Sequence, residues 1–152
     1  MAADHAGVVA GIAAGAGLRI AVIDSGVNAA HPHIRKIAGG LTITADSQED
    51  GYTDVLGHGT AVMAAIQEKA PAADYFAVRI FKSRLQTDVD VVLHAIEWCV
   101  RQRVDIINLS LGTTNPAHAE RFAPWMNSAI LVAARLAGSE SMARGVAGGS
   151  LQ

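Results

Sequence analysis

Two short motifs carry the side chains best suited to acid–base chemistry. Residues 20–26 form an apolar run that ends in Asp24 and a glycine turn, and residues 56–63 place His58 between two glycines, just before a run of helical character. A carboxylate that orients an imidazole makes that imidazole an effective general base. Together with a third partner, a nucleophile, this pair would support hydrolysis.

The segments around these motifs alternate between strand and helix. Continuous apolar or β-branched runs predict strands, and apolar positions at helical spacing predict helices. Strands are expected at 18–23, 41–44, 75–81, 105–111 and 129–134, and helices at 60–69, 88–102 and 116–126, with a short one around 8–14. Thr87 or Asp88 can cap the helix over 88–102. This alternation indicates an open, mainly parallel α/β sheet with right-handed crossovers.

The predicted architecture also indicates where the two motifs meet. In an open α/β sheet, ligands bind in the crevice beyond the carboxyl ends of the strands. Asp24 follows the first strand, residues 110–112 close a later one, and His58 opens a helix that points away from that edge. We therefore expect these stretches to converge on one cleft. Taken singly, each side chain also has a simpler interpretation, since Asp24 can end a strand in a turn and His58 can face solvent.

The composition limits the class of protein. With 152 residues, of which 51% are hydrophobic and 17% charged, the chain is expected to form one globular domain. A net charge of −2 gives no reason to expect nucleic acid or an anionic membrane as a partner. Cys99 is the single cysteine, so no internal disulfide can form, and its place in a helical pattern indicates a small buried hydrophobe.

The first residues give no sign of a targeting segment. Residues 1–17 are rich in Ala and Gly, but they lack the basic start of a secretory signal. No segment reaches the roughly 18 uninterrupted apolar residues of a membrane span. A cytoplasmic location is therefore favoured, and no membrane partner is expected.

Three motifs, in order, carry a family resemblance. Asp24-Ser25-Gly26 and Gly57-His58-Gly59-Thr60 resemble the Asp and His motifs of the subtilisin-like serine proteases, or subtilases. The Ile-Asn-Leu-Ser-Leu-Gly run at 107–112 resembles the family's strand and cleft-lining segment. Asp54 fits the family's Asp-x-x-Gly-His-Gly-Thr pattern, although a plain surface-loop carboxylate is an equal alternative. The resemblance covers about residues 18–134 and implies a three-layer α/β fold with helices on both faces of the sheet.

The resemblance implies a serine endopeptidase that acts on peptides or proteins. Asp24 would orient and stabilise His58, which would take a proton from a serine hydroxyl and later deliver it to the leaving amine. Ser141 is the candidate nucleophile, because Ser141-Met142-Ala143 is similar to the family's nucleophile helix. The substrate-binding residues would be Ser110, Leu111 and Gly112, whose main-chain groups would pair with an extended peptide.

After residue 134 the chain departs from the family pattern. Arg135 and Leu136 stand where the family has the segment with its oxyanion-binding Asn, and Glu140 replaces a Thr beside the candidate nucleophile. Loss of one oxyanion donor costs about 3–4 kcal/mol of transition-state stabilisation. An inactive pseudoprotease, or a fragment that binds extended peptides without cleavage, is therefore the alternative function.

The expected domain organisation follows from where the family resemblance begins and where the chain departs from it. A lead-in at 1–17 precedes a subtilase-like α/β core at 18–134, which is apparently truncated after the oxyanion strand, and a divergent Gly/Ser/Ala-rich tail fills 135–152. A shortened C-terminal part would leave one side of the sheet uncovered, which favours self-association.

No cofactor or metal ion is expected. The acidic side chains at 46–54 lack the glycine and spacing of an EF-hand, so calcium binding there has no support from the pattern. These side chains are Asp46, Glu49, Asp50 and Asp54. A nucleotide-binding α/β protein is a third reading, but no Gly-x-Gly-x-x-Gly follows the first strand and no Walker-type loop is present.

Overall fold

A six-stranded sheet forms the centre of the molecule. The structure, a computed structural model, describes residues 14–111, 120–121 and 130–133. The strand order is β3-β2-β4-β1-β5-β6. All neighbouring strands are parallel except β2 and β3, which are antiparallel. The strands are β1 Arg19–Asp24, β2 Gly39–Ile43, β3 Gln48–Asp50, β4 Asp74–Arg79, β5 Ile106–Leu109 and β6 Ile130–Ala133.

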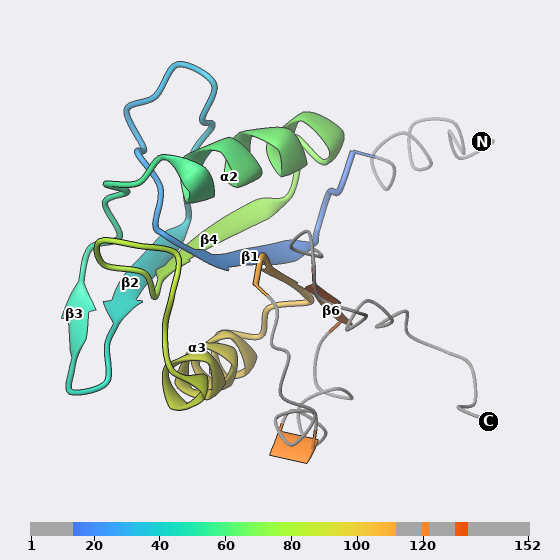
Figure 1. Cartoon of the computed structure of the whole chain (residues 1–152). Helices are drawn as coiled ribbons and strands as arrows, with labels where there is room; N and C mark the ends of the chain where they lie inside the picture. The colour runs from blue at the N-terminus through green and yellow to red at the C-terminus, as the bar shows by residue number, and fades with distance from the viewer. Residues whose placement is uncertain (1–13, 112–119, 122–129, 134–152) are drawn as a thin grey trace, which may run out of the picture.

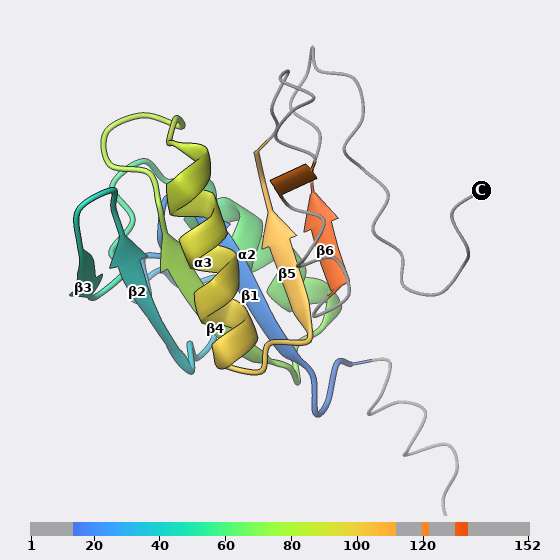
Figure 2. The same ribbon diagram turned by 90° about the horizontal axis from the view of Figure 1, so that it is seen from below.

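Two helices cover opposite faces of this sheet. Helix α2 (His58–Lys69) lies on one face and α3 (Val89–Arg101) on the other, which gives three layers (Figure 1). Figure 2 shows α3 in front of the strands and α2 behind them. The predicted fold class, a mainly parallel α/β sheet with helices on both faces, is confirmed. Neither of these helices has the length and apolar character that a membrane-crossing helix needs.

Strand β1 is apolar from Ile20 to Ile23 because both of its faces are covered there. Ile20 and Val22 belong to the core cluster beneath α2, whereas Ala21 and Ile23 belong to the cluster beneath α3. All four side chains are at most 3% exposed. Side chains alternate between the faces of a strand, so Asp24 falls on the same face as Ile20 and Val22, the face that carries α2.

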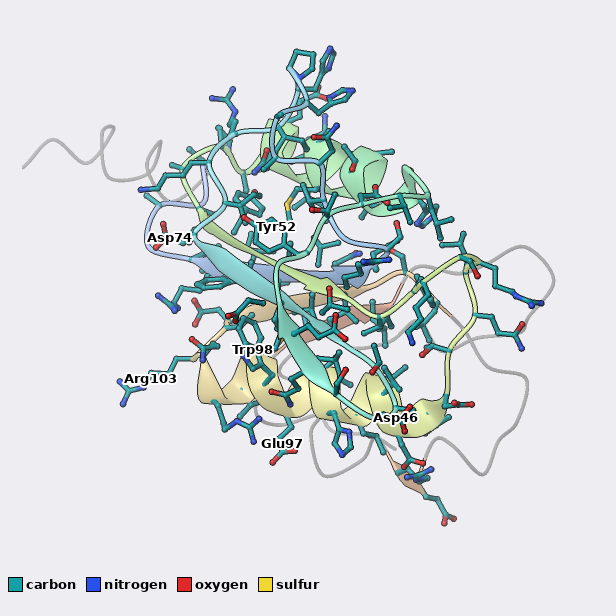
Figure 3. The ribbon with its side chains drawn as sticks, turned by 90° about the vertical axis from the view of Figure 1, so that its left-hand side faces the viewer. Asp46, Tyr52, Asp74, Glu97, Trp98 and Arg103 are labelled. Atoms are coloured by element: carbon teal, nitrogen blue, oxygen red, sulfur yellow. The ribbon has the colours of Figure 1, made fainter. Side chains whose placement is uncertain are left out.

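Helix α3 packs on the sheet through a single apolar stripe. Its buried residues are Val91, Val92, Ala95, Ile96 and Cys99, which recur at helical spacing. Trp98 points toward the sheet, where its ring meets Phe76 edge-on with the centroids 6.3 Å apart, and Glu97 points away (Figure 3). The Cys99 side chain is fully buried, as its sequence pattern indicates. Burial raises the pKa of its thiol to about 12.

Strand β3 is not among the strands that the sequence pattern predicts. Strand β3 consists of Gln48, Glu49 and Asp50, all exposed at the edge of the sheet. The Thr44 amide donates to the Ser47 carbonyl at 2.9 Å and so helps close the turn before it. A wholly polar strand has no alternating apolar pattern, and charged side chains are typical of a protected sheet edge. For this reason the sequence pattern predicts no strand at these residues.

The other expected helices and strands that fall within the described residues are present, but their ends differ from the predicted ones. Helix α2 begins at His58 rather than at residue 60, and the last expected strand appears as β6. Asp88 precedes α3, but its side chain makes no capping hydrogen bond. The helices expected around 8–14 and 116–126 lie almost wholly outside the described residues.

Candidate active site

Asp24 and His58 meet at the carboxyl end of β1. Asp24 is the last residue of the strand, and His58 is the first residue of α2. The Nδ1 atom of His58 lies 2.8 Å from Oδ1 and 2.9 Å from Oδ2 of Asp24, across 34 residues of sequence. The expectation that strand β1 and the helix opened by His58 converge at this edge agrees with the observed geometry.

The hydrogen bonds of this pair define how the imidazole is oriented. Carboxylate oxygens only accept hydrogen bonds, so Nδ1 of His58 is the donor to Asp24. The backbone amide of Ser25 also donates to Asp24 Oδ1, at 2.7 Å. With Nδ1 engaged, Nε2 of His58 remains as the proton acceptor of the ring. The Asp24 side chain is 1% exposed and that of His58 is 34% exposed, so the imidazole spans the distance from a buried carboxylate to solvent.

Two glycines allow the strand and the helix to approach so closely. A Cβ atom on Gly59 would lie 2.2 Å from the Gly26 carbonyl oxygen and 3.2 Å from Asp24 Cβ. Gly26 itself has φ +97°, and a Cβ there would lie 2.3 Å from the carbonyl oxygen of Tyr52. Only glycine fits at both positions without a backbone shift. The glycines in the two sequence motifs therefore bring the acid and the base together.

The N-terminus of α2 is capped by residues outside the helix. Its N-cap residue is Gly57, with φ 85°, which has no side chain to offer. The first amides of a helix need acceptors. The Gly59 amide donates to Ser25 Oγ at 2.8 Å, and the Thr60 amide donates to Asp54 Oδ2 at 3.0 Å. Ser25 and Asp54 thus replace the missing cap.

Asp54 is accordingly more than a solvated loop carboxylate. Burial acts to raise the pKa of its carboxyl group, but hydrogen bonds from Thr60, Gly57 and Leu56 outweigh this and hold the pKa below the usual value. The sequence leaves two interpretations of Asp54 open, a member of the family pattern before His58 or a plain surface-loop carboxylate. Ser25 is known from the sequence only as part of the Asp24-Ser25-Gly26 motif, and no sequence signal shows that its hydroxyl reaches a helix 34 residues away.

Of the predicted substrate-binding residues, the structure describes Ser110 and Leu111. Leu109 pairs with Ile23 in the parallel ladder between β5 and β1, so Ser110 follows β5 at the level at which Asp24 ends β1. Asn108 Nδ2 donates to Ser110 Oγ at 2.7 Å, which fixes that hydroxyl. Leu111 packs against the core cluster beneath α3. The other predicted site residues, Gly112 and Ser141, lie outside the described residues.

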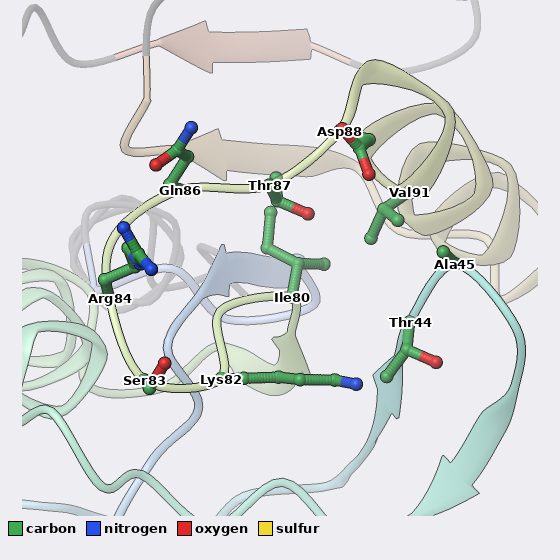
Figure 4. Close-up of a pocket in the computed structure, with 10 residues that line it drawn as sticks. All are labelled: Thr44, Ala45, Ile80, Lys82, Ser83, Arg84, Gln86, Thr87, Asp88 and Val91. Atoms are coloured by element: carbon green, nitrogen blue, oxygen red, sulfur yellow. The ribbon is translucent and has the colours of Figure 1, made fainter.

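Two cavities open near this end of the sheet. One, of about 610 Å³, is lined by Asn28, His31, His33, Asp54 and Thr60, among others, beside the start of α2. The other, of about 480 Å³, lies between the end of β2 and the loop that leads from β4 into α3 (Figure 4). Its lining includes Thr44, Lys82 and Arg84. The first cavity reaches the Asp54 carboxylate, so the network around Asp54 is accessible from solvent.

The described part of the chain offers no metal centre. Within it, no three His, Cys, Asp or Glu side chains are grouped so that they could hold a metal ion. Asp46, Glu49 and Asp50 are exposed. The fourth acidic residue, Asp54, directs its carboxylate oxygens at N–H and O–H donors instead.

Fold and site together define an α/β protein with an oriented Asp–His pair at the carboxyl edge of a parallel sheet. The chain belongs to the subtilase family, since the sequence profile described as "Subtilase family" matches residues 15–140. This match covers the two motifs, the cleft-lining segment and every described strand.

Individual relatives agree with this membership. The chain is 39% identical over 110 residues to a thermostable alkaline protease of Halalkalibacterium halodurans, a match that covers 66% of this chain and 29% of the relative. An intracellular serine protease of Paenibacillus polymyxa is 34% identical, with 64% and 34% covered. Subtilisin E of Bacillus subtilis is 33% identical, with 64% and 28% covered. The matched region therefore spans about a third or less of the length of these relatives.

Proposed function

We propose that this chain is a serine endopeptidase domain of the subtilisin type, in which Asp24 and His58 form the acid–base part of the catalytic centre. The observation that carries the proposal is the hydrogen bond from His58 Nδ1 to the buried carboxylate of Asp24, which makes Nε2 the proton acceptor of a partly exposed ring. Membership of the subtilase family, and the protease names of the relatives, support the same reaction class.

The chemistry follows from the orientation of the ring. Nε2 of His58 takes the proton of a serine hydroxyl as its oxygen attacks the carbonyl carbon of a peptide bond. The imidazolium that forms is stabilised by the Asp24 carboxylate, and it then protonates the leaving amine. The pair needs little reorganisation for this step, because the strand, the helix and the glycines already hold Asp24 and His58 in hydrogen-bonding contact.

Ser141 is the proposed nucleophile, and an extended peptide is the proposed substrate. The peptide would lie along Ser110, Leu111 and Gly112 and add to the sheet through main-chain hydrogen bonds. The position of Ser110 beside the end of β1 supports this placement. The serine is indispensable, since its removal from the triad of subtilisin, a relative of this chain, costs about a million-fold in turnover.

A covalent probe tests the whole proposal. A fluorophosphonate forms a bond from the activated serine oxygen to phosphorus and releases fluoride, so intact-mass measurement reports one added group. We expect labelling of the wild-type chain at Ser141, none in Ser141→Ala, and strongly slowed labelling in His58→Gln. Ser139→Ala is the matched control and should label like the wild type.

The same experiment distinguishes catalysis from the alternative function, which is peptide binding without cleavage. An unlabelled wild-type chain that still binds an extended peptide would overturn the catalytic proposal and establish a peptide-binding pseudoprotease. Labelling at a residue other than Ser141 would overturn the assignment of the nucleophile.

A further inference from the structure

The Asp54 carboxylate receives five hydrogen bonds from three separate parts of the chain. Its Oδ1 accepts from the Ser25 hydroxyl and from the backbone amides of Leu56 and Gly57, each at 2.9 Å. Its Oδ2 accepts from the amide and the hydroxyl of Thr60, at 3.0 and 2.5 Å. One oxygen therefore holds the turn after β1 and the loop before α2, and the other holds the helix.

Ser25 links this carboxylate to the Asp24–His58 pair. Its hydroxyl donates to Asp54 and accepts from the Gly59 amide, while its own amide donates to Asp24 Oδ1. That same Asp24 oxygen accepts from His58 Nδ1. The two carboxylates are thus connected through a single, fully buried residue.

Thr60 completes the connection from the side of the helix. Besides its two bonds to Asp54, its hydroxyl oxygen accepts from the amide of Asn28 at 3.0 Å. Thr60 is 7% exposed and lies two residues after His58 in the first turn of α2. Because His58 and Thr60 share this turn, the bonds of Thr60 to Asp54 also restrain the position of the imidazole.

We propose that Asp54 is a positioning residue which, through Ser25 and Thr60, fixes the strand end and the helix start so that His58 keeps its proton on Nδ1 and its Nε2 free. A helix cap alone would use one oxygen on the first turn. Here the other oxygen is bonded to the residue next to Asp24, so the carboxylate couples the positions of acid and base. The effect of Asp54 on catalysis rests on the proposed function. The orientation of His58, in contrast, can be measured without any reaction.

The test is the tautomer of His58 in the folded chain. Two-dimensional NMR of protein labelled with ¹⁵N in its histidines, recorded at pH 8, distinguishes the Nδ1–H form from the Nε2–H form. We expect the Nδ1–H form in the wild type. In Asp54→Asn one of the two oxygens becomes an NH₂ group, which cannot accept from Thr60 in one orientation of the amide or from Ser25, Leu56 and Gly57 in the other. The Nε2–H form should therefore rise by at least about fivefold relative to the Nδ1–H form. The exposed Asp46→Asn change is the matched control and should leave the tautomer unaltered.

A second variant separates positioning from simple loss of the fold. Ser25→Ala keeps the bonds of Asp54 to α2 but removes its bond to the turn after β1, so we expect the same direction of change in a chain that remains folded. If either Asp54→Asn or Ser25→Ala is folded and keeps the wild-type tautomer, the proposal is overturned, even if its melting temperature falls. An Nε2–H form in the wild type would also overturn it. Failure of fluorophosphonate labelling, in contrast, bears on the proposed function alone.

Discussion

The α-carbon of Gly59 faces the carbonyl oxygen of Gly26 so closely that a β-carbon on Gly59 would lie 2.2 Å from that oxygen. This contact sets the distance from α2 to the end of β1, and therefore the distance from His58 to Asp24. The shape of the backbone, as much as the two polar side chains, defines the candidate site.

The first prediction concerns Gly59→Ala. The added methyl group must push α2 away from the turn at Gly26, which should lower the free energy of unfolding by about 1–3 kcal/mol and lengthen the His58–Asp24 hydrogen bond. Urea unfolding and the NMR signal of the His58 ring report these two effects. Gly39→Ala is the matched control, because a Cβ there meets only the Phe76 ring, at 3.5 Å. Equal stability of the two variants would contradict the prediction.

The second prediction concerns pH and Asp54. Hydrogen bonds from Thr60, Gly57 and Leu56 hold the pKa of Asp54 below its usual value of 3.8 against the opposing effect of burial. The unfolded chain therefore binds the proton first, and the stabilisation is complete above about pH 5 and is lost as the pH falls through 3.8 and then through the lower pKa of the folded state.

Urea unfolding at a series of pH values checks this sign. The stability advantage of the wild type over Asp54→Asn should be constant near neutral pH and shrink as the pH falls below about 4. Asp46→Asn should show no such pH-dependent difference from the wild type. An advantage over Asp54→Asn that grows toward acid pH would be the opposite of the expected result.

The third prediction concerns the other end of α2. The hydroxyl of Tyr75, a residue 1% exposed, donates to the Ala70 carbonyl at 2.7 Å and to that of Ile66 at 3.3 Å. Tyr75→Phe removes this hydroxyl, and the two carbonyls keep only the bonds from the Ala70 and Ala73 amides, so we expect a loss of about 0.5–1.5 kcal/mol of unfolding free energy.

Faster amide exchange in the last turn of α2 should accompany this loss in Tyr75→Phe. Tyr52→Phe is a suitable control, because Tyr52 is half-buried in the cluster beneath α2 and the described residues offer its hydroxyl no hydrogen bond. Its stability should change by less than about 0.5 kcal/mol. The prediction is wrong if both variants unfold at the same urea concentration.

The fourth prediction concerns Cys99. Its side chain is fully buried against the sheet, and burial raises the pKa of its thiol to about 12, so almost no thiolate exists near neutral pH. A thiol-reactive disulfide reagent at pH 8 should modify the native chain only at the rate of global unfolding. The urea-unfolded chain should react within the mixing time, and rapid modification of the native chain would refute the expected burial.

Much of the fold was predictable because its signals are local. The apolar run before Asp24 indicated a strand buried on both faces, and the stripe of apolar residues that includes Cys99 indicated α3. Strand β3 gave no such signal, because its residues are polar and lie at the sheet edge. The ends of α2 and β4 also differ from expectation, since capping and strand pairing, rather than propensity, decide where an element stops.

For the site, the sequence by itself determined which residues stand at a strand end and at a helix start. It placed Asp24 before a glycine turn and His58 between glycines. The family pattern pointed to Asp54 as well, but left open that Asp54 is only a surface-loop carboxylate. Only the tertiary structure decided that Asp24 and α2 share one face of the sheet, and that Asp54 reaches Ser25 across 29 residues. The physical reason is that a hydrogen bond depends on the positions of two groups in space, and chain segments this far apart are positioned by the packing of the whole sheet and its helices.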